Sequence, residues 1–356
     1  MTRKTTGSQS ANRSATIADV AKAAGVSVPT VSRILNDKDY VAEDTRQRVH
    51  EAIRTLGYAP HAQARRLRGG ASMTLAMHHP VGSPHELRNV IEIPYITGAA
   101  AAASEKEYFL NFLASRLTPD SLLNMYRSNQ IDGVILLQVS MDDWRVNLLR
   151  ENNYPFVMLG RCEELDGLSF VDLDFESAIL QAFDYLLALG HRNIGFLTYP
   201  QSWRKDRIGP AVHSLYGYKK ALEHSSVHSC YREIGWNSVE EGSQATNELL
   251  QENPELTAII TVSHSTAAGS IKALTLHGRS VPKDCSVMSI GFGADLANVV
   301  TPSLTTLEWS PYEVSYQATI LMTEQLANRD LPARQVLVPP KLVVRESTKE
   351  AALLRF

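Results

Sequence analysis

Residues 16–70 of this 356-residue chain read TIADVAKAAGVSVPTVSRILNDKDYVAEDTRQRVHEAIRTLGYAPHAQARRLRGG, and this segment carries the strongest structural signal in the sequence. Thr16 begins a capping-box-like pattern at a helix start, and Gly25 is placed to end that helix. Ser27 can cap a second helix, in which Pro29 is tolerated because the first turn has no intrahelical use for its N–H. The spacing therefore predicts two short helices joined by a tight turn, which is a helix-turn-helix.

A third helix is predicted from Glu43 to Leu56, with an apolar face that closes a three-helix core. The side chains expected to face inward are those of Ile17, Val20, Ala21, Ala24, Val31, Ile34, Leu35, Val49, Ala52, Ile53 and Leu56. The outward side of the second helix is left for solvent or a ligand. In a helix-turn-helix the second helix is the one that enters the major groove of DNA.

The charge of the chain is unevenly distributed along the sequence. Residues 1–70 contain twelve Lys and Arg against six Asp and Glu, a net charge of +6, whereas the remainder contains 23 against 32, a net charge of −9. A small basic module on a larger acidic body indicates that only the first part meets a polyanion. A basic face is also compatible with simple solvation, so charge alone does not decide the function.

The elements D-V-A, A-G-V-S, T-V-S-R, L-G-Y and A-R-x-L follow one another within residues 19–67. In this combination the segment resembles the DNA-binding headpiece and hinge of the lactose/galactose repressor (LacI/GalR) family, nearly position by position over about fifty residues. The resemblance implies a transcription regulator, and most often a repressor, that binds a near-palindromic operator as a homodimer. It also implies that residues 15–60 form the headpiece. Residues 1–14 are rich in Ser, Thr and Asn and lack apolar periodicity, which predicts a disordered tail.

The resemblance assigns the DNA contacts to the first two helices. Val28, Pro29 and Arg33 fall on the positions that read bases, and Arg33 is the best direct reader because a guanidinium donates two parallel hydrogen bonds to guanine. A phosphate contact is the alternative for Arg33. The hydroxyl residues are better suited to phosphates, which position the module without reading sequence. They are Thr16, Ser27, Thr30 and Ser32.

Residues 61–71 resemble the hinge helix of the family, which forms when two subunits meet on an operator. About eight residues are too few for a stable isolated helix, so DNA and the partner hinge must supply the ordering energy. The resemblance implies that Leu67 is a wedge inserted from the minor groove, with Ala64 packed nearby. Arg65, Arg66 and Arg68 then hold flanking phosphates. The alternative is that Leu67 is an ordinary linker residue.

From residue 72 onward, short apolar runs alternate with helical stretches, which predicts an α/β body built from parallel sheets and crossover helices. About 285 residues exceed one core, so two lobes are expected. The resemblance extends here through IDGVIL, LGHRNIGFL, PELTAII and VPKDCSVMSIGF, and implies a periplasmic-binding-protein-like effector and dimerisation domain, 72–356. The expected N-lobe comprises residues 72–172 and 304–330. The expected C-lobe comprises residues 173–303 and 331–350.

The expected effector cleft lies between the lobes at the carboxyl ends of the strands, and here the sequence departs from the family. Where the family usually has Asn-Asp, this chain has Ser263-His264, and where the family commonly has Arg, it has Ser214. The frequent family sequence G-F-D-D is replaced by G-F-G-A, which begins at Gly291. The retained candidates for effector binding are Arg161, Asp174 and Trp236, beside the replaced positions Ser214 and His264. Gln138, Trp203 and His78 are weaker candidates at expected strand ends or cleft loops.

A cleft with fewer carboxylates and a possible imidazolium could accept an acidic group. The alternatives left open are a sugar or sugar derivative, another small and possibly anionic metabolite, and no effector at all.

Other function classes find little support in the sequence. No nucleophile elbow, phosphate-binding loop or H-E-x-x-H pair is present, and the three cysteines are widely separated, so neither catalysis, a metal site nor a cofactor is expected. No apolar run suits a membrane span or a secretory signal, which predicts a cytoplasmic protein and disfavours a secreted solute-binding protein, the remaining alternative.

Overall fold

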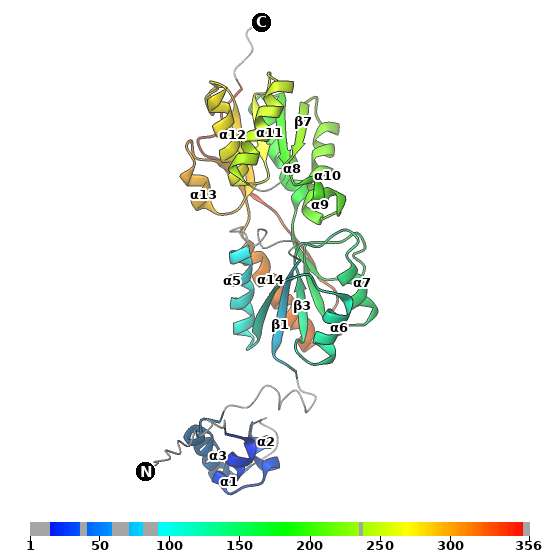
Figure 1. Cartoon of the computed structure of the whole chain (residues 1–356), viewed down its shortest axis with the longest axis vertical. Coiled ribbons are helices and arrows are strands. Elements are labelled where there is room, and N and C mark those ends of the chain that lie inside the picture. Colours follow the sequence, from blue (N-terminus) through cyan, green and yellow to red (C-terminus); the bar gives the residue numbers. More distant parts are fainter. Residues whose placement is uncertain (1–14, 36–40, 59–70, 81–91, 235–237, 352–356) are drawn as a thin grey trace, which may run out of the picture. The chain divides into compact units, whose positions relative to one another are not determined.

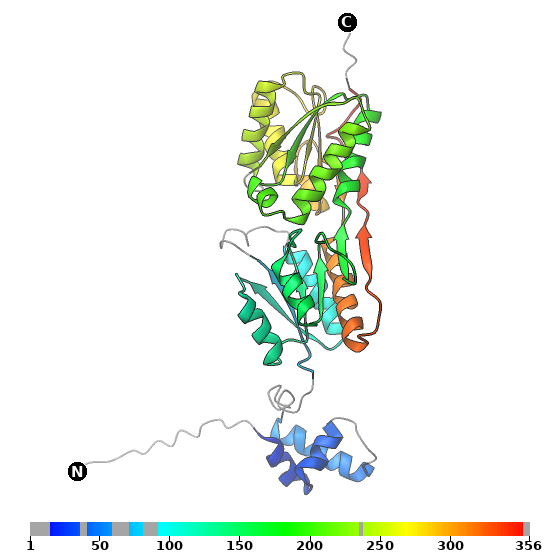
Figure 2. The same ribbon diagram turned by 90° about the vertical axis from the view of Figure 1, so that its right-hand side faces the viewer.

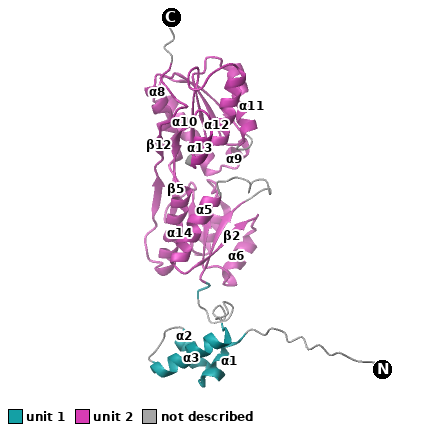
Figure 3. Cartoon of the chain, turned by 90° about the vertical axis from the view of Figure 1, so that its left-hand side faces the viewer, with its two compact units in different colours: residues 1–72 teal, residues 73–356 magenta. Residues whose placement is uncertain are grey.

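The computed structural model describes residues 15–35, 41–58, 71–80, 92–234 and 238–351 (Figure 1). The chain divides into two compact units, Met1–Ser72 and Met73–Phe356, which are coloured separately in Figure 3. No helix among the described residues has both the length and the apolar character that a membrane crossing needs.

The described residues of the first unit form the helices α1 (Ile17–Ala24), α2 (Val28–Leu35) and α3 (Glu43–Leu56). Gly25 ends α1 in the left-handed conformation, with φ of 67°, which glycine adopts without strain. The core of the unit consists of Val20, Ala21, Ala24, Val31, Ile34, Val49, Ala52 and Tyr58. These contacts reproduce the predicted helix-turn-helix with its closing helix.

One predicted core residue of this unit is wrong. Leu56 is exposed, whereas Tyr58 is buried. The reason is the chain reversal at Gly57, which ends α3 with φ of 58° and places Tyr58 against the core. Arg48 adds a polar contact between helices, because its Nη1 donates to the carbonyl of Ala24 at the end of α1.

The second unit contains two parallel-dominated sheets with helices on both faces (Figure 2). The N-lobe sheet has the order β11-β5-β4-β3-β1-β2, and all of its strand pairs are parallel. Its strands are β1 (Thr74–His79), β2 (Phe109–Ala114), β3 (Gly133–Leu136), β4 (Phe156–Leu159), β5 (Phe170–Leu173) and β11 (Gln335–Val338). Its helices are α5 (Glu92–Glu105), α6 (Pro119–Arg127), α7 (Trp144–Glu151) and α14 (Pro311–Ala327).

The C-lobe sheet has the order β12-β10-β9-β8-β6-β7, in which only the β10–β12 pair is antiparallel. Its strands are β6 (Asn193–Thr198), β7 (His228–Glu233), β8 (Ala258–Thr261), β9 (Ser286–Gly291), β10 (Thr305–Glu308) and β12 (Lys341–Val343). Its helices are α8 (Phe175–Ala188), α9 (Gln201–Lys205), α10 (Gly209–Glu223), α11 (Val239–Glu252), α12 (His264–Leu276) and α13 (Ala294–Val299).

Both faces of the N-lobe sheet are apolar, as expected of parallel strands covered on two sides. On β1, Leu75 and Met77 pack with α5 and α14, whereas Ala76 packs with the α6 and α7 side. This alternation along the strand explains why the strand sequences read as continuous apolar runs rather than as half-polar ones.

The predicted lobe boundaries need one correction. Strand β10, which was expected in the N-lobe, pairs with β9 and β12 in the C-lobe sheet. Conversely, β11 was expected in the C-lobe but pairs with β5 in the N-lobe sheet. The chain therefore crosses between the lobes after β5, after β10 and between β11 and β12. The third crossover is the short connection between β11 and β12, because these two consecutive strands belong to different sheets.

Candidate functional sites

The first candidate site is the outward face of α2 in the first unit. Val28, Pro29 and Arg33 are exposed, and Thr30 and Ser32 are half-buried. The opposite side of the helix supplies Val31 and Ile34 to the core. The residues of α2 that are predicted to meet DNA therefore share one accessible face.

Hydroxyl side chains cap the N-termini of α1 and α2. Thr16 Oγ1 accepts from the Asp19 amide at 3.3 Å, and the Thr16 amide donates to Asp19 Oδ2 at 2.8 Å, which completes the capping box of α1. Ser27 Oγ accepts from the Thr30 amide at 3.3 Å and lies 2.8 Å from Thr30 Oγ1. These caps orient the two helix N-termini, whose amides and dipoles attract phosphate.

Several predicted site residues lie outside the described residues. They are Ala64, Arg65, Leu67 and Arg68 of the expected hinge, and Trp236 of the expected effector cleft.

The second candidate site lies in the second unit, at the carboxyl ends of the strands. Gln138 follows β3 and Arg161 follows β4, whereas Ser214 lies on α10 and His264 begins α12 directly after β8. In open α/β sheets, ligands bind at this end of the strands. The predicted effector residues thus come from both lobes.

Six buried polar side-chain atoms near these strand ends have no hydrogen-bond partner within the described part of the chain. They are Gln138 Oε1, Arg161 Nη2, Thr198 Oγ1, His213 Nε2, Ser214 Oγ and His264 Nε2. Buried polar atoms are normally paired, and each unpaired one costs about 1–3 kcal/mol. Such a group of unpaired donors and acceptors indicates a place where a small molecule or water completes the hydrogen bonding.

Arg161 forms a buried ion pair with Asp172, a residue that the sequence analysis did not select. The guanidinium Nε donates to Asp172 Oδ2 at 3.1 Å. Burial raises the pKa of the Asp172 carboxyl to about 7, against the opposing effect of Arg161. The guanidinium of Arg161 therefore faces a carboxyl within the protein, and its buried Nη2 has no hydrogen-bond partner among the described residues.

The two histidines of the site are neutral near pH 7. Burial lowers the pKa of His264 to about 4, and its Nδ1 lies 3.0 Å from Ser289 Oγ. Burial also lowers the pKa of His213 to about 4, with a further lowering by the charge of Arg161. The imidazolium considered for His264 in the sequence analysis is thus disfavoured by burial. His213 was missed because its neighbour Ser214 occupied the family position.

His78, a weaker candidate, belongs to a structural network instead. Its Nε2–H donates to the Ser115 carbonyl at 2.9 Å, and its Nδ1 accepts from Arg145 Nη1 at 2.9 Å. Arg145 is buried, pairs with Asp143 at 2.6 Å and donates to the Leu137 carbonyl at 3.0 Å. All polar atoms of the His78 ring are therefore occupied, and the network fixes the loop that follows β3.

Asp174 and Trp203, two further candidates, also have partners within the protein. Asp174 Oδ1 accepts from the Ser177 amide at 3.1 Å and so caps α8. Trp203 stacks on Tyr199 with ring centroids 5.4 Å apart. Tyr199 in turn meets Phe175 edge to face. Both residues are close to the strand ends, but their observed contacts are structural.

Trp309 connects the two lobes. It follows β10 and packs against the cores of both lobes, and it meets Phe175 and Phe292 edge to face with centroids 6.2 and 5.6 Å apart. These rings therefore form an aromatic cluster where Trp309 packs against both lobes.

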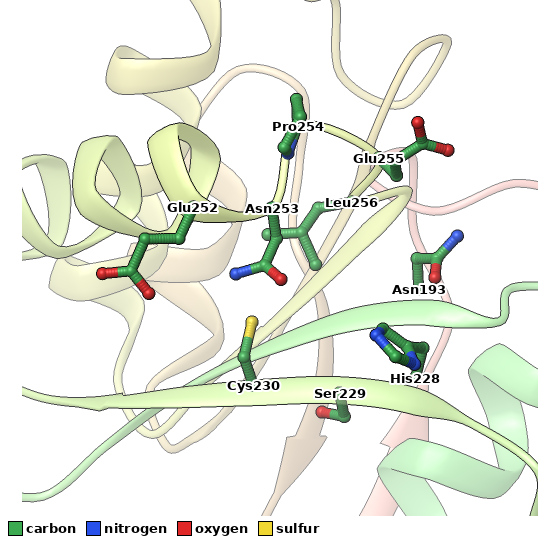
Figure 4. A pocket seen from close by; sticks show the side chains of 9 residues that line it. All are labelled: Asn193, His228, Ser229, Cys230, Glu252, Asn253, Pro254, Glu255 and Leu256. Atoms are coloured by element: carbon green, nitrogen blue, oxygen red, sulfur yellow. The ribbon is translucent and has the colours of Figure 1, made fainter.

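A cavity of about 370 Å³ is present at the other end of the C-lobe sheet (Figure 4). Asn193 and His228, which line it, are the first residues of β6 and β7. The cavity therefore lies at the amino ends of the strands, away from the unpaired polar atoms. Ligands of open α/β sheets bind at the carboxyl ends of the strands, so this cavity lies at the end opposite to the one expected for an effector.

Comparison with known proteins gives two family matches. The family "Bacterial regulatory proteins, lacI family" matches residues 16–61, and "Periplasmic binding protein-like domain" matches residues 183–348.

Full-length relatives and solved structures agree with these matches. Catabolite control protein A of Priestia megaterium is 30% identical over 94% of this chain and 99% of its own length. A transcriptional regulator CelR–cellobiose complex covers 94% of this chain and 99% of its own, with 26% identity and a TM-score of 0.67. The Lac repressor dimer bound to operator and the anti-inducer ONPF covers 95% and 100%, with 23% identity and a TM-score of 0.82.

Proposed function

The chain belongs to the lacI family of bacterial regulatory proteins and is a DNA-binding transcription regulator, and from this premise we propose that it represses a carbohydrate or related metabolic operon as a homodimer controlled by a small-molecule effector. The observation that carries the proposal is the exposed face of α2 on a basic helix-turn-helix unit, joined to a two-lobed body with unpaired buried polar atoms. The relatives it matches are regulators, which supports regulation rather than catalysis.

In the proposed complex, α2 enters the major groove. Arg33 donates two hydrogen bonds to guanine, and Val28 and Pro29 pack against a thymine methyl or exclude bulk. Thr16, Ser27, Thr30 and Ser32 contact phosphates together with the helix N-termini. The exposure of Val28, Pro29 and Arg33 supports these roles.

The hinge supplies the second part of the proposed DNA recognition. Leu67, with Ala64 beside it, kinks the duplex from the minor groove, and Arg65 and Arg68 hold the flanking phosphates. A footprint on the DNA flanking the protein's own gene tests the proposal as a whole. Protection of a near-palindromic site by the native protein, and its loss in Leu67→Ala with general DNA affinity retained, is the expected result. Unchanged protection in Leu67→Ala would contradict the wedge.

The effector is a neutral, polyhydroxylated molecule such as a sugar. The pKa of both His213 and His264 lies near 4, so these two side chains offer hydrogen bonds without charge, and the Arg161 guanidinium already faces the Asp172 carboxyl within the protein. An anionic ligand would need an unpaired cation, whereas a neutral sugar needs donors, acceptors and an aromatic surface. The cellobiose bound to CelR, a protein of the same fold, fits this chemistry.

A thermal-shift screen of the intact protein tests the effector class. D-Ribose, D-glucose and cellobiose represent neutral sugars, and glucose 6-phosphate and gluconate represent anionic ones. We expect a shift with a neutral sugar that is lost in His264→Ala and kept in His277→Ala, a matched exposed histidine of the C-lobe. A shift with the anionic compounds alone would reject the neutral class.

A further inference from the structure

The two lobes are joined by a noncovalent contact in addition to the three chain crossovers. Residues 139–141 follow β3 in the N-lobe, and residues 207–209 lead into α10 in the C-lobe. Ser140 and Ile208 form an antiparallel bridge between these segments. The Met141 amide donates to the Arg207 carbonyl at 2.8 Å, and the Gly209 amide donates to the Val139 carbonyl at 2.9 Å.

Both sides of this contact are shaped to hold it. On the N-lobe side, Ser140 N donates to Asp143 Oδ2 at 3.2 Å, and Asp143 is held by the buried Arg145. On the C-lobe side, a Cβ on Gly209 would lie 3.2 Å from the Val139 oxygen and 3.4 Å from the Arg161 oxygen. The absence of a side chain at Gly209 therefore allows the two backbones to approach.

The contact borders the unpaired polar atoms. Gln138 precedes the N-lobe segment, Arg161 lies against Gly209, and His213 is one helical turn further along α10. In the arrangement observed, the unpaired atoms of these residues are closed off from solvent. The contact between the two segments therefore lies beside atoms that a ligand would have to reach.

We propose that residues 139–141 and 207–209 form an interlobe latch that closes the effector site, so that an effector enters only after the latch opens. The inference rests on the proposed location of the effector site. The two backbone hydrogen bonds contribute about 1 kcal/mol each, so thermal motion can break them. The two segments can therefore separate and rejoin, as a gate requires. The Arg207–Glu163 ion pair is exposed on both sides and adds little.

The first experiment asks whether the latch is closed in solution. Because the two hydrogen bonds flank Ser140 and Ile208, these residues are a non-hydrogen-bonded antiparallel pair, whose Cα atoms lie about 4.5 Å apart, within disulfide range. The S140C/I208C variant is expected to form the 140–208 disulfide on mild oxidation of the ligand-free protein, as read by peptide mapping. Pairing of the new cysteines with native Cys162, or no disulfide at all, would overturn the latch.

The second experiment asks whether the latch controls access. Ser214→Cys exchanges one buried oxygen for sulfur, and methyl methanethiosulfonate measures how often that atom is reached, with native Cys230 as an internal reference. Adding Gly209→Val is expected to raise the labelling rate of residue 214 about tenfold, because it forces the segments apart. Ser202→Val, which places the same side chain on an exposed site of α9, is the control.

An unchanged rate in the Gly209→Val background would overturn the gate. So would equally fast labelling of residues 214 and 230 without that change. Glu163→Gln is expected to alter the rate less than about threefold. Neither experiment uses DNA or an effector, so a failed footprint would reject the proposed function and leave these results standing.

Discussion

Arg33 is the residue whose chemistry can specify a base most directly. It is exposed on the same side of α2 as Val28 and Pro29, which have no side-chain donor. A guanidinium that pairs with guanine O6 and N7 contributes about 1–3 kcal/mol of discrimination, whereas a phosphate contact contributes none.

Arg33→Ala is therefore expected to relax selection at one base pair in each half-site, with about 10- to 100-fold loss on the preferred operator. The measurement is a binding panel of operator variants at fixed salt. A loss of equal size on every variant would make Arg33 a phosphate contact. Because a phosphate contact also changes the salt dependence, the slope against salt concentration gives an independent check.

The buried histidines make the stability of the body depend on pH. The pKa of His78, His213 and His264 is lowered to about 4, so between pH 6.5 and 4 the unfolded chain binds protons that the folded chain does not. Acidification in this window therefore destabilises the fold. Asp172 acts in the opposite direction, because its raised pKa lets the folded chain hold a proton that the unfolded chain has lost.

His213→Gln is expected to remove one of the protons that the unfolded chain binds, and the folded chain does not, between pH 6.5 and 4. The free energy of unfolding of the variant should fall less steeply with acidification, by about 1.4 kcal/mol per pH unit between pH 6.5 and 4.5. All four tryptophans lie in the second unit, so their fluorescence during urea unfolding reports this unit alone. Equal slopes for the variant and the native protein would show that His213 is protonated in the folded state.

The sequence identified the positions at which this chain differs from its family, but it did not predict the environments of the side chains at those positions. Ser214 and His264 were selected from motif spacing, and both are buried beside unpaired atoms. The neutrality of His264 was not predictable, because burial determines its pKa and burial depends on β9 and β10, far away in sequence. Asp172 was missed because it lies within a strand and becomes relevant only through its contact with Arg161.

At the scale of elements, the local signals of the first unit were the most reliable. The predicted α1 start, the Gly25 turn and the limits of α3 are confirmed because they depend on neighbours in sequence. The lobe assignment of β10 and β11 was wrong because strand pairing is a long-range property, and neither four-residue strand carries a local signal that selects one sheet over the other. Leu56 was wrongly predicted to be buried, because the apolar periodicity of α3 extends to Leu56 whereas the buried residues of the helix do not.

The helix caps of the first unit provide a matched pair of predictions. Thr16 caps α1 with its side chain, whereas Ala42 at the start of α3 has no side-chain cap. Thr16→Ala should weaken the unit by about 1 kcal/mol, and Ala42→Ser should strengthen it by a similar amount. Hydrogen exchange of the helix amides in the intact protein should change about fivefold in opposite directions. Changes of the same sign in both variants would contradict the capping argument.

At the scale of the whole molecule, the proposed regulator acts as a homodimer, because two tethered headpieces gain affinity that one lacks. Helices α5, α12 and α13 lie on the side of the second unit that faces the viewer in Figure 3, and we propose that this side forms the dimer contact. Large apolar side chains are exposed on these helices, with Ile93 at 62% and Val299 at 78% exposure. Exposed apolar residues gathered on one face are typical of a protein–protein interface.

Substitution on this face should separate dimerisation from DNA contact. Ile93→Glu combined with Val299→Glu buries two unpaired carboxylates in the proposed interface, which should raise the dimer dissociation constant by at least about 100-fold. Sedimentation velocity measures the dimer, and operator binding should fall with it while salt-sensitive binding to general duplex DNA persists, since each headpiece keeps its own contacts. Val344→Glu, an exposed apolar position after β12, is the control. A double variant that remains dimeric would show that the interface lies elsewhere. A double variant that is monomeric yet binds its operator with native affinity would contradict the requirement for two tethered headpieces.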